Sequence, residues 1–125
     1  MNMDELKREN TIHYFSDRVS HFRDLAHTLK QDDRADEAVF ARVRMNVYDI
    51  FSAVFSAAVK TAGQDDEKAV QFFLKKIEQI PQSWRTALAN AELHGETEKA
   101  HIERIKLEAA GEIQTEFKRL WEVST

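Results

Sequence analysis

Histidine and carboxylate side chains gather at two places in this sequence, where together they could bind a divalent metal. His94, Glu98 and His101 lie close together in the chain, and His27 stands in a separate segment. Imidazole nitrogen and carboxylate oxygen suit zinc, iron or manganese without any cysteine. Glu98 and His101 are three residues apart, so a helix would place both on one face. The pattern predicts a candidate metal site at one end of a helical bundle.

The same acidic residues have a simpler interpretation, as helix caps and as partners of the helix dipole. Histidines beside them would then be ordinary surface residues. A di-metal centre in the middle of a bundle needs Glu-x-x-His on two helices. The segment Glu98–His101 has that spacing, but Asp24–His27 is only a weak second copy, with Asp24 pointing away from the expected core. We therefore expect no mid-bundle di-metal centre.

Other catalytic patterns are not found in the sequence. Ser52 and Ser56 share a helical stripe with Asp49, but no histidine lies near them in the chain. There is no Gly-rich phosphate loop, no HExxH motif and no EF-hand loop. The composition contains no cysteine, which rules out thiolate chemistry and cysteine-bound zinc. We predict no catalytic residue and no cofactor.

Composition indicates one soluble, all-α domain spanning residues 1–125. Hydrophobic residues make up 42% and charged residues 32%, while three Gly and one Pro are too few for a β-rich chain. A net charge of −4 without any basic run argues against nucleic acid as a partner. The N-terminus lacks the apolar segment of a signal peptide, so the cytoplasm is the expected compartment. The most apolar stretch, Val47–Ala62, is too short to cross a membrane and carries Asp49 and Lys60.

Val47–Ala62 also organises the expected fold, because its apolar residues cover roughly 200° of a helix and a surface helix needs little more than about 100°. Other elements must therefore cover this helix on two sides. We expect it to run from about Ala35 to Ala62 and to end at Gly63. Asp32 or Asp33 could cap its start, and Asp65 or Asp66 could cap the following helix.

Three further helices complete the prediction. The first starts near Asp4, with a seam that is apolar every three or four residues (Ile12, Phe15, Val19, Phe22, Ala26, Leu29). The third runs from Asp66 to His94 and is kinked or briefly broken at Ile80–Ser83, where Pro81 removes a hydrogen bond and Ser83 could cap a fresh start. Gly95 should form a turn, and Thr97 should cap the last helix, whose interior is interrupted by Gly111.

The helices have similar lengths and short connections, which predicts an up-down-up-down four-helix bundle with the third helix kinked at Pro81. His94 should point inward at one end of that bundle. The apolar surplus of the second helix favours a protein partner or a homodimer. The leading interpretation is a cytoplasmic interaction or regulatory protein that acts through its helix surfaces. The alternative is a bundle that binds a metal or a small ligand, conceivably an enzyme.

Overall fold

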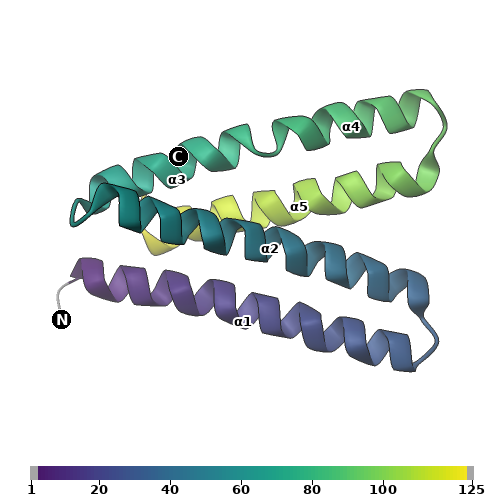
Figure 1. The fold of residues 1–125 in the computed structure, drawn as a ribbon, viewed down its shortest axis with the longest axis horizontal. Coiled ribbons are helices and arrows are strands. Elements are labelled where there is room, and N and C mark those ends of the chain that lie inside the picture. Colours follow the sequence, from purple (N-terminus) through teal and green to yellow (C-terminus); the bar gives the residue numbers. More distant parts are fainter. Residues whose placement is uncertain (1–2, 124–125) are drawn as a thin grey trace.

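All regular structure in the described part of the chain, residues 3–123, is helical in the computed structural model (Figure 1). Helix accounts for 88% of that part, and no strand occurs within it. The helices are α1 (Met3–Gln31), α2 (Ala35–Ala62), α3 (Asp66–Gln79), α4 (Gln82–Leu93) and α5 (Thr97–Leu120). The all-α class predicted from the sequence is confirmed, and the bounds of α2 agree with the prediction to the residue.

Helix α2 holds the central position. It contacts α1, α3 and α5, so it is covered on more than one side, as its wide apolar arc predicts. In Figure 1, α2 runs back beside α1, α3 and α4 follow one another along an edge, and α5 returns beside α4. The α1–α2 turn and the α4–α5 turn lie at the same end of this view, well apart from each other.

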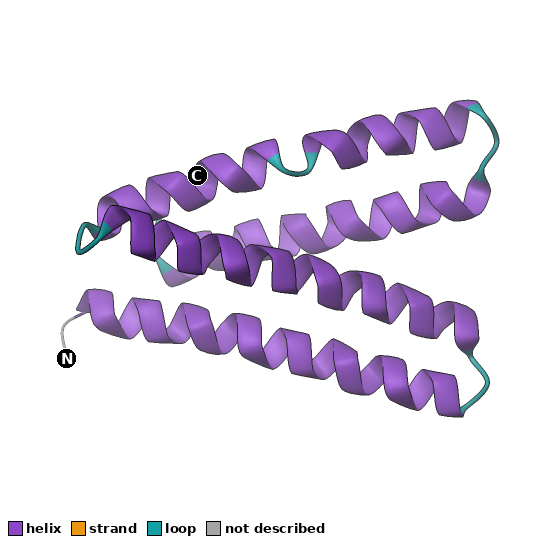
Figure 2. Ribbon diagram, in the orientation of Figure 1, coloured by secondary structure: helices purple, strands orange, loops and turns teal. Residues whose placement is uncertain are grey.

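The interruption at Pro81 is short and changes the helix direction little. Helix α3 ends at Gln79 and α4 begins at Gln82, with the connection drawn as loop in Figure 2. The axis bends by 14° at residues 80–81, less than the roughly 20° that defines a sharp kink. The hydrogen-bond ladder resumes at once, because the Arg85 amide donates to the Pro81 carbonyl at 3.0 Å. Pro81 itself takes the N-cap position expected of Ser83, whose hydroxyl instead donates to the Ile80 carbonyl.

The turns that follow α2 and α4 use the glycines as predicted. Gly63 and Gly95 have φ values of +66° and +68°, a conformation that side chains with a Cβ rarely adopt. At the second turn the Glu96 amide donates to the Ala91 carbonyl at 2.8 Å, which closes the end of α4. Asp65 caps α3, because its carboxylate accepts the Lys68 amide at 3.1 Å.

Besides Ser83, two further expected caps are wrong. Neither Asp32 nor Asp33 caps α2, because Arg34 takes the N-cap position and offers no side-chain hydrogen bond. Asp33 has a φ of +58° and belongs to the end of α1, where the Arg34 amide donates to the Leu29 carbonyl. Thr97 does not cap α5 either; it is already the first residue of that helix.

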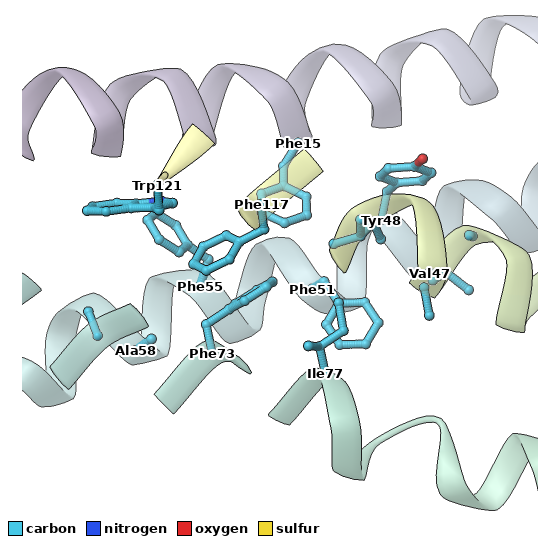
Figure 3. Packing of buried hydrophobic residues seen from close by; sticks show 14 of the residues in the cluster. Phe15, Val47, Tyr48, Phe51, Phe55, Ala58, Phe73, Ile77, Phe117 and Trp121 are labelled. Atoms are coloured by element: carbon cyan, nitrogen blue, oxygen red, sulfur yellow. The ribbon is translucent and has the colours of Figure 1, made fainter. Parts of the chain in front are cut away.

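Aromatic side chains from α1, α2, α3 and α5, with Trp121 directly after α5, meet in the main core (Figure 3). The Phe73 and Phe117 rings stack with their centroids 4.1 Å apart, and Phe55 contacts both edge-on. Several of these rings are almost wholly buried (Phe15, Phe51, Phe55, Phe73, Phe117). A smaller cluster of Ala26, Leu29, Ala38 and Ala41 joins α1 to α2 near their turn. This packing fixes the relative positions of α1, α2 and α5, which carry the candidate site.

The seam predicted for α1 is confirmed at Phe15, Phe22, Ala26 and Leu29, but it is wrong at Ile12. Ile12 is 57% exposed, and the neighbouring Thr11 is fully buried in its place. The Thr11 hydroxyl accepts the indole N–H of Trp121 at 2.9 Å, so a polar residue is satisfied inside the core.

No helix within the described residues is long and apolar enough to cross a membrane.

Candidate functional site

A wide, open groove of about 790 Å³ lies between α1, α2 and α5. Tyr14 and Arg18 of α1 form one wall, and Tyr48 of α2 lies between the walls. The opposite wall belongs to α5 (Gly111, Glu112, Thr115, Glu116). Several polar side chains converge at this groove, which is open to solvent along most of its length. We call it the tyrosine groove, since it contains both tyrosines of the chain.

Tyr48 links the three helices through a chain of hydrogen bonds. Its ring is 1% exposed and stacks on Phe22, with ring centroids 5.6 Å apart. Figure 3 shows its hydroxyl pointing out of the aromatic core toward α1. That hydroxyl donates to Glu112 Oε2 at 2.9 Å, and the Tyr14 hydroxyl approaches it at 3.5 Å. The packing of α2 therefore places a phenol at the base of a polar groove.

The surroundings raise the pKa of both phenols above the ordinary tyrosine value, so both stay protonated well beyond neutral pH. Burial is the main cause that raises the pKa of Tyr14, and its hydrogen bond with Tyr48 raises that pKa further. Burial also raises the pKa of Tyr48, against a smaller lowering by the Tyr14 hydroxyl. Both residues consequently offer hydroxyl groups rather than phenolates to the groove.

Charged side chains of opposite sign stand on the two walls of the groove. The Arg18 guanidinium lies over the rings of Phe22 and Tyr48, at 4.7 and 5.5 Å from their centroids. Arg18 takes part in none of the ion pairs found among residues 3–123. On the other wall, a hydrogen bond from Arg119 lowers the pKa of Glu116 and keeps it ionised. Glu112 has only the Tyr48 hydroxyl as its hydrogen-bond partner in the described structure.

The residues of the predicted metal site lie on the surface near the two turns at one end. His27 is exposed near the end of α1, and Glu98 and His101 are exposed on α5. The prediction that His94 points inward is wrong, because His94 is exposed and its Nδ1–H donates to the Asn90 carbonyl at 2.7 Å.

Within residues 3–123 no three histidine or carboxylate side chains form a group that could hold a metal ion. The His101 ring instead packs edge-on against Phe40 of α2, with centroids 4.5 Å apart. Metal binding by His94, Glu98, His101 and His27 stays a prediction, which a metal titration can test.

The tyrosine groove was not predicted from the sequence. Tyr48 lies inside the apolar stretch Val47–Ala62, where nothing in the local sequence sets it apart from its neighbours. Its partners lie 34 residues before it and 64 residues after it, so no local spacing connects them. One available signal was composition: the chain has only two tyrosines, and both fall next to apolar seams.

Comparison of the chain with known protein families, with curated proteins and with solved structures gives no match.

Proposed function

We propose that this chain is a cytoplasmic interaction or regulatory protein that acts as a homodimer through a face of α2. In this proposal the helices form an up-down-up-down bundle, with α3 and α4 together as a third helix that is briefly broken and slightly bent at Pro81. The proposed dimer face is an apolar strip that we call the α2 stripe (Val39, Val43, Ile50, Val54, Ala57).

The exposure of the α2 stripe is the observation that carries the proposal. Ile50 is 40% exposed and Val39 is 37% exposed, although α2 is the central helix of the fold. Members of the stripe follow one another at spacings of three, four and seven residues, the pattern with which helices pack along a seam. Val54 also packs against the main core, so the stripe continues the core to the surface. A second copy could add its own stripe in a two-fold symmetric contact.

The total exposed area supports the same proposal. The chain exposes 7779 Å², whereas a compact monomer of 14.5 kDa is expected to expose roughly 6,900 Å². The chain thus exposes more surface than a compact monomer of the same mass, as a protein with an uncovered helix face does.

Light scattering coupled to size exclusion, at concentrations up to the millimolar range, tests the proposal. We expect a mass of twice 14.5 kDa for the unmodified chain. Ile50→Lys should give the monomer mass, because a lysine in the centre of the seam leaves its charge without a partner. Ile12→Lys is the matched control, since Ile12 is an exposed isoleucine on α1, and it should leave the dimer intact.

A monomer mass for the unmodified chain at every concentration would refute the dimer. An Ile50→Lys variant that stays dimeric would refute this use of the α2 stripe.

A further inference from the structure

Two unpaired charges of opposite sign accompany the α2 stripe. Arg42 and Asp49 are both exposed on α2, and neither takes part in any ion pair found among residues 3–123. They are seven residues apart, so the helix places one almost directly above the other, with a drift of only about 20°. Both charges therefore stand on the same flank of the stripe.

A polar residue interrupts the stripe between these two charges. Asn46 is exposed and divides the seven-residue step from Val43 to Ile50 into spacings of three and four. A single asparagine within an apolar seam is known to set the register in which two helices pair. The stripe therefore carries both an apolar surface and a polar mark that fixes its alignment with a partner.

We infer that the second copy binds with its α2 antiparallel, with the two-fold axis beside Asn46, so that Arg42 of each copy pairs with the partner's Asp49. This inference rests on the proposed dimer. In a two-fold antiparallel pair of helices, the same flank of both helices meets and runs in opposite directions. A residue before the axis therefore faces a residue equally far after it, and the contact occurs twice. The midpoint of residues 42 and 49 falls next to Asn46, so one axis aligns both the charges and the asparagines.

The same alignment keeps apolar residues together. With the axis at Asn46, Val39 faces the partner's Ala53, seven residues to either side. Figure 1 shows α2 in front of α5, and Asn46 and Ala53 both lie on the exposed side of α2. A second α2 can consequently cover the stripe without placing a charge in the seam.

A parallel pair does not use the two charges. In that arrangement the flank with Arg42 and Asp49 would face the opposite flank of the partner, so the two residues could not meet. The self-complementary charges therefore favour a second copy of this chain, in the antiparallel orientation.

Charge reversal tests the ion pairs, with sedimentation equilibrium as the measurement of the dissociation constant. Arg42→Asp places a second negative charge opposite the partner's Asp49, and Asp49→Arg places a second positive charge opposite the partner's Arg42. Each should raise the dissociation constant by about tenfold or more, because like charges oppose each other on both sides of the axis. The double variant Arg42→Asp/Asp49→Arg should dimerise like the unmodified chain, since it restores opposite charges.

A control and a mixture separate pairing from net charge. Arg23→Asp makes the same change of charge at an exposed arginine on α1 and should leave the dissociation constant unchanged. An equal mixture of the two single variants should form the mixed dimer, because each supplies the charge that the other lacks. Far-ultraviolet circular dichroism checks that every variant is folded.

Single cysteines test the orientation, since the chain contains none of its own. Asn46→Cys should form a disulfide between the two copies, because the Cα atoms of a disulfide lie within about 7 Å and position 46 lies at the axis. Ala57→Cys is the matched control on the same stripe. Position 57 lies roughly 16 Å along α2 from the axis, so its two copies would be roughly 33 Å apart and should not crosslink.

The outcomes separate this inference from the proposed dimer. A chain that stays monomeric at every concentration overturns both. A dimer that Ile50→Lys disrupts, but that Arg42→Asp and Asp49→Arg leave unchanged, overturns the antiparallel pairing alone. Failure of the double variant to restore the dimer, or equal crosslinking through Asn46→Cys and Ala57→Cys, overturns it as well.

Discussion

Replacing Thr11 with valine should destabilise the protein, although the change only exchanges a hydroxyl for a methyl group of similar size. Thr11 is fully buried and joins the first turns of α1 to the end of α5. Its hydroxyl accepts the Trp121 indole N–H at 2.9 Å and donates to the Lys7 carbonyl at 2.7 Å. Valine would leave the indole N–H buried, since Trp121 is only 7% exposed, and without an acceptor.

The size of the effect follows from the cost of an unsatisfied donor. A buried polar group that loses its partner costs about 1–3 kcal/mol, whereas a satisfied hydrogen bond contributes only about 1 kcal/mol net. The Lys7 carbonyl remains within α1, so most of the lost stability comes from the Trp121 indole N–H, which no longer has an acceptor. We expect a loss of about 2 kcal/mol for Thr11→Val and a smaller loss of about 1 kcal/mol for Thr11→Ser, which keeps the hydroxyl but loses a buried methyl group. With a urea slope of about 1–3 kcal/mol/M, the midpoint should fall by roughly 1 M.

Urea unfolding of three variants and the unmodified chain measures the coupling between the two side chains. Thr11→Val, Trp121→Phe, the double variant and the unmodified chain form a double-mutant cycle. Thr11→Val should lower the free energy of unfolding less in the Trp121→Phe background, because that background has no indole N–H that could lose its acceptor. Equal costs in both backgrounds would show that the hydrogen bond contributes nothing and would refute the reasoning. A loss as large in Thr11→Ser as in Thr11→Val would refute it as well.

Three further predictions concern glycine, tyrosine and metal. Gly111→Ala should raise the free energy of unfolding by about 1 kcal/mol, because a Cβ there meets no atom within 4 Å; Gly95→Ala, at a φ of +68°, should lower it in the same denaturation assay. Tyrosinate absorbance, which reports Tyr14 and Tyr48 alone, should rise well above pH 10 in the folded chain and near pH 10 in the denatured chain. Because the folded state binds the two phenol protons more tightly, the free energy of unfolding should stay constant below about pH 10 and fall as the pH rises above it. Equal titration of the folded and the denatured chain would contradict this. If the predicted metal site exists, zinc or manganese should raise the melting temperature, and replacing His94 and His101 together with alanine should abolish the rise; no rise with any divalent metal would end that hypothesis.

The local signals in the sequence were sufficient for the helix bounds. Gly63 and Gly95 mark helix ends because only a residue without a Cβ adopts their positive φ cheaply. Asp65 caps α3 because its carboxylate reaches an amide three residues ahead. In each of these cases, the sequence signal and its physical cause lie within a few residues of each other.

The cap before α2 shows why a correct residue type can still be given the wrong role. Asp33 is a good N-cap residue, but it adopts a φ of +58° to let the Arg34 amide close the end of α1. An N-cap needs a different, extended backbone, so one residue cannot serve both helices. With only a short connection between Gln31 and Ala35, the end of α1 determines the conformation.

Ile12 and Thr11 illustrate the limit of a repeat pattern on one helix. The pattern selects the apolar residue for the core, but a helix of 3.6 residues per turn drifts against a repeat of 3.5. Near the start of α1 that drift favours Thr11, and the Trp121 side chain provides the donor that makes its burial tolerable. The partner is 110 residues away, so no window along the chain contains both.

The tyrosine groove also depends on residues that are far apart in the sequence. The apolar arc of α2 therefore predicted how the helices pack but not which polar groups meet at its edge. The arc required neighbours on both sides, and α1, α3 and α5 are those neighbours. Where α1 and α5 stand on either side of Tyr48, the hydroxyl at the edge of the arc becomes the meeting point of Tyr14 and Glu112. On the opposite side of α2, Ile50 remains 40% exposed. One wide arc thus contains a core, a polar groove and an uncovered stripe, and only the positions of the other helices divide it among the three.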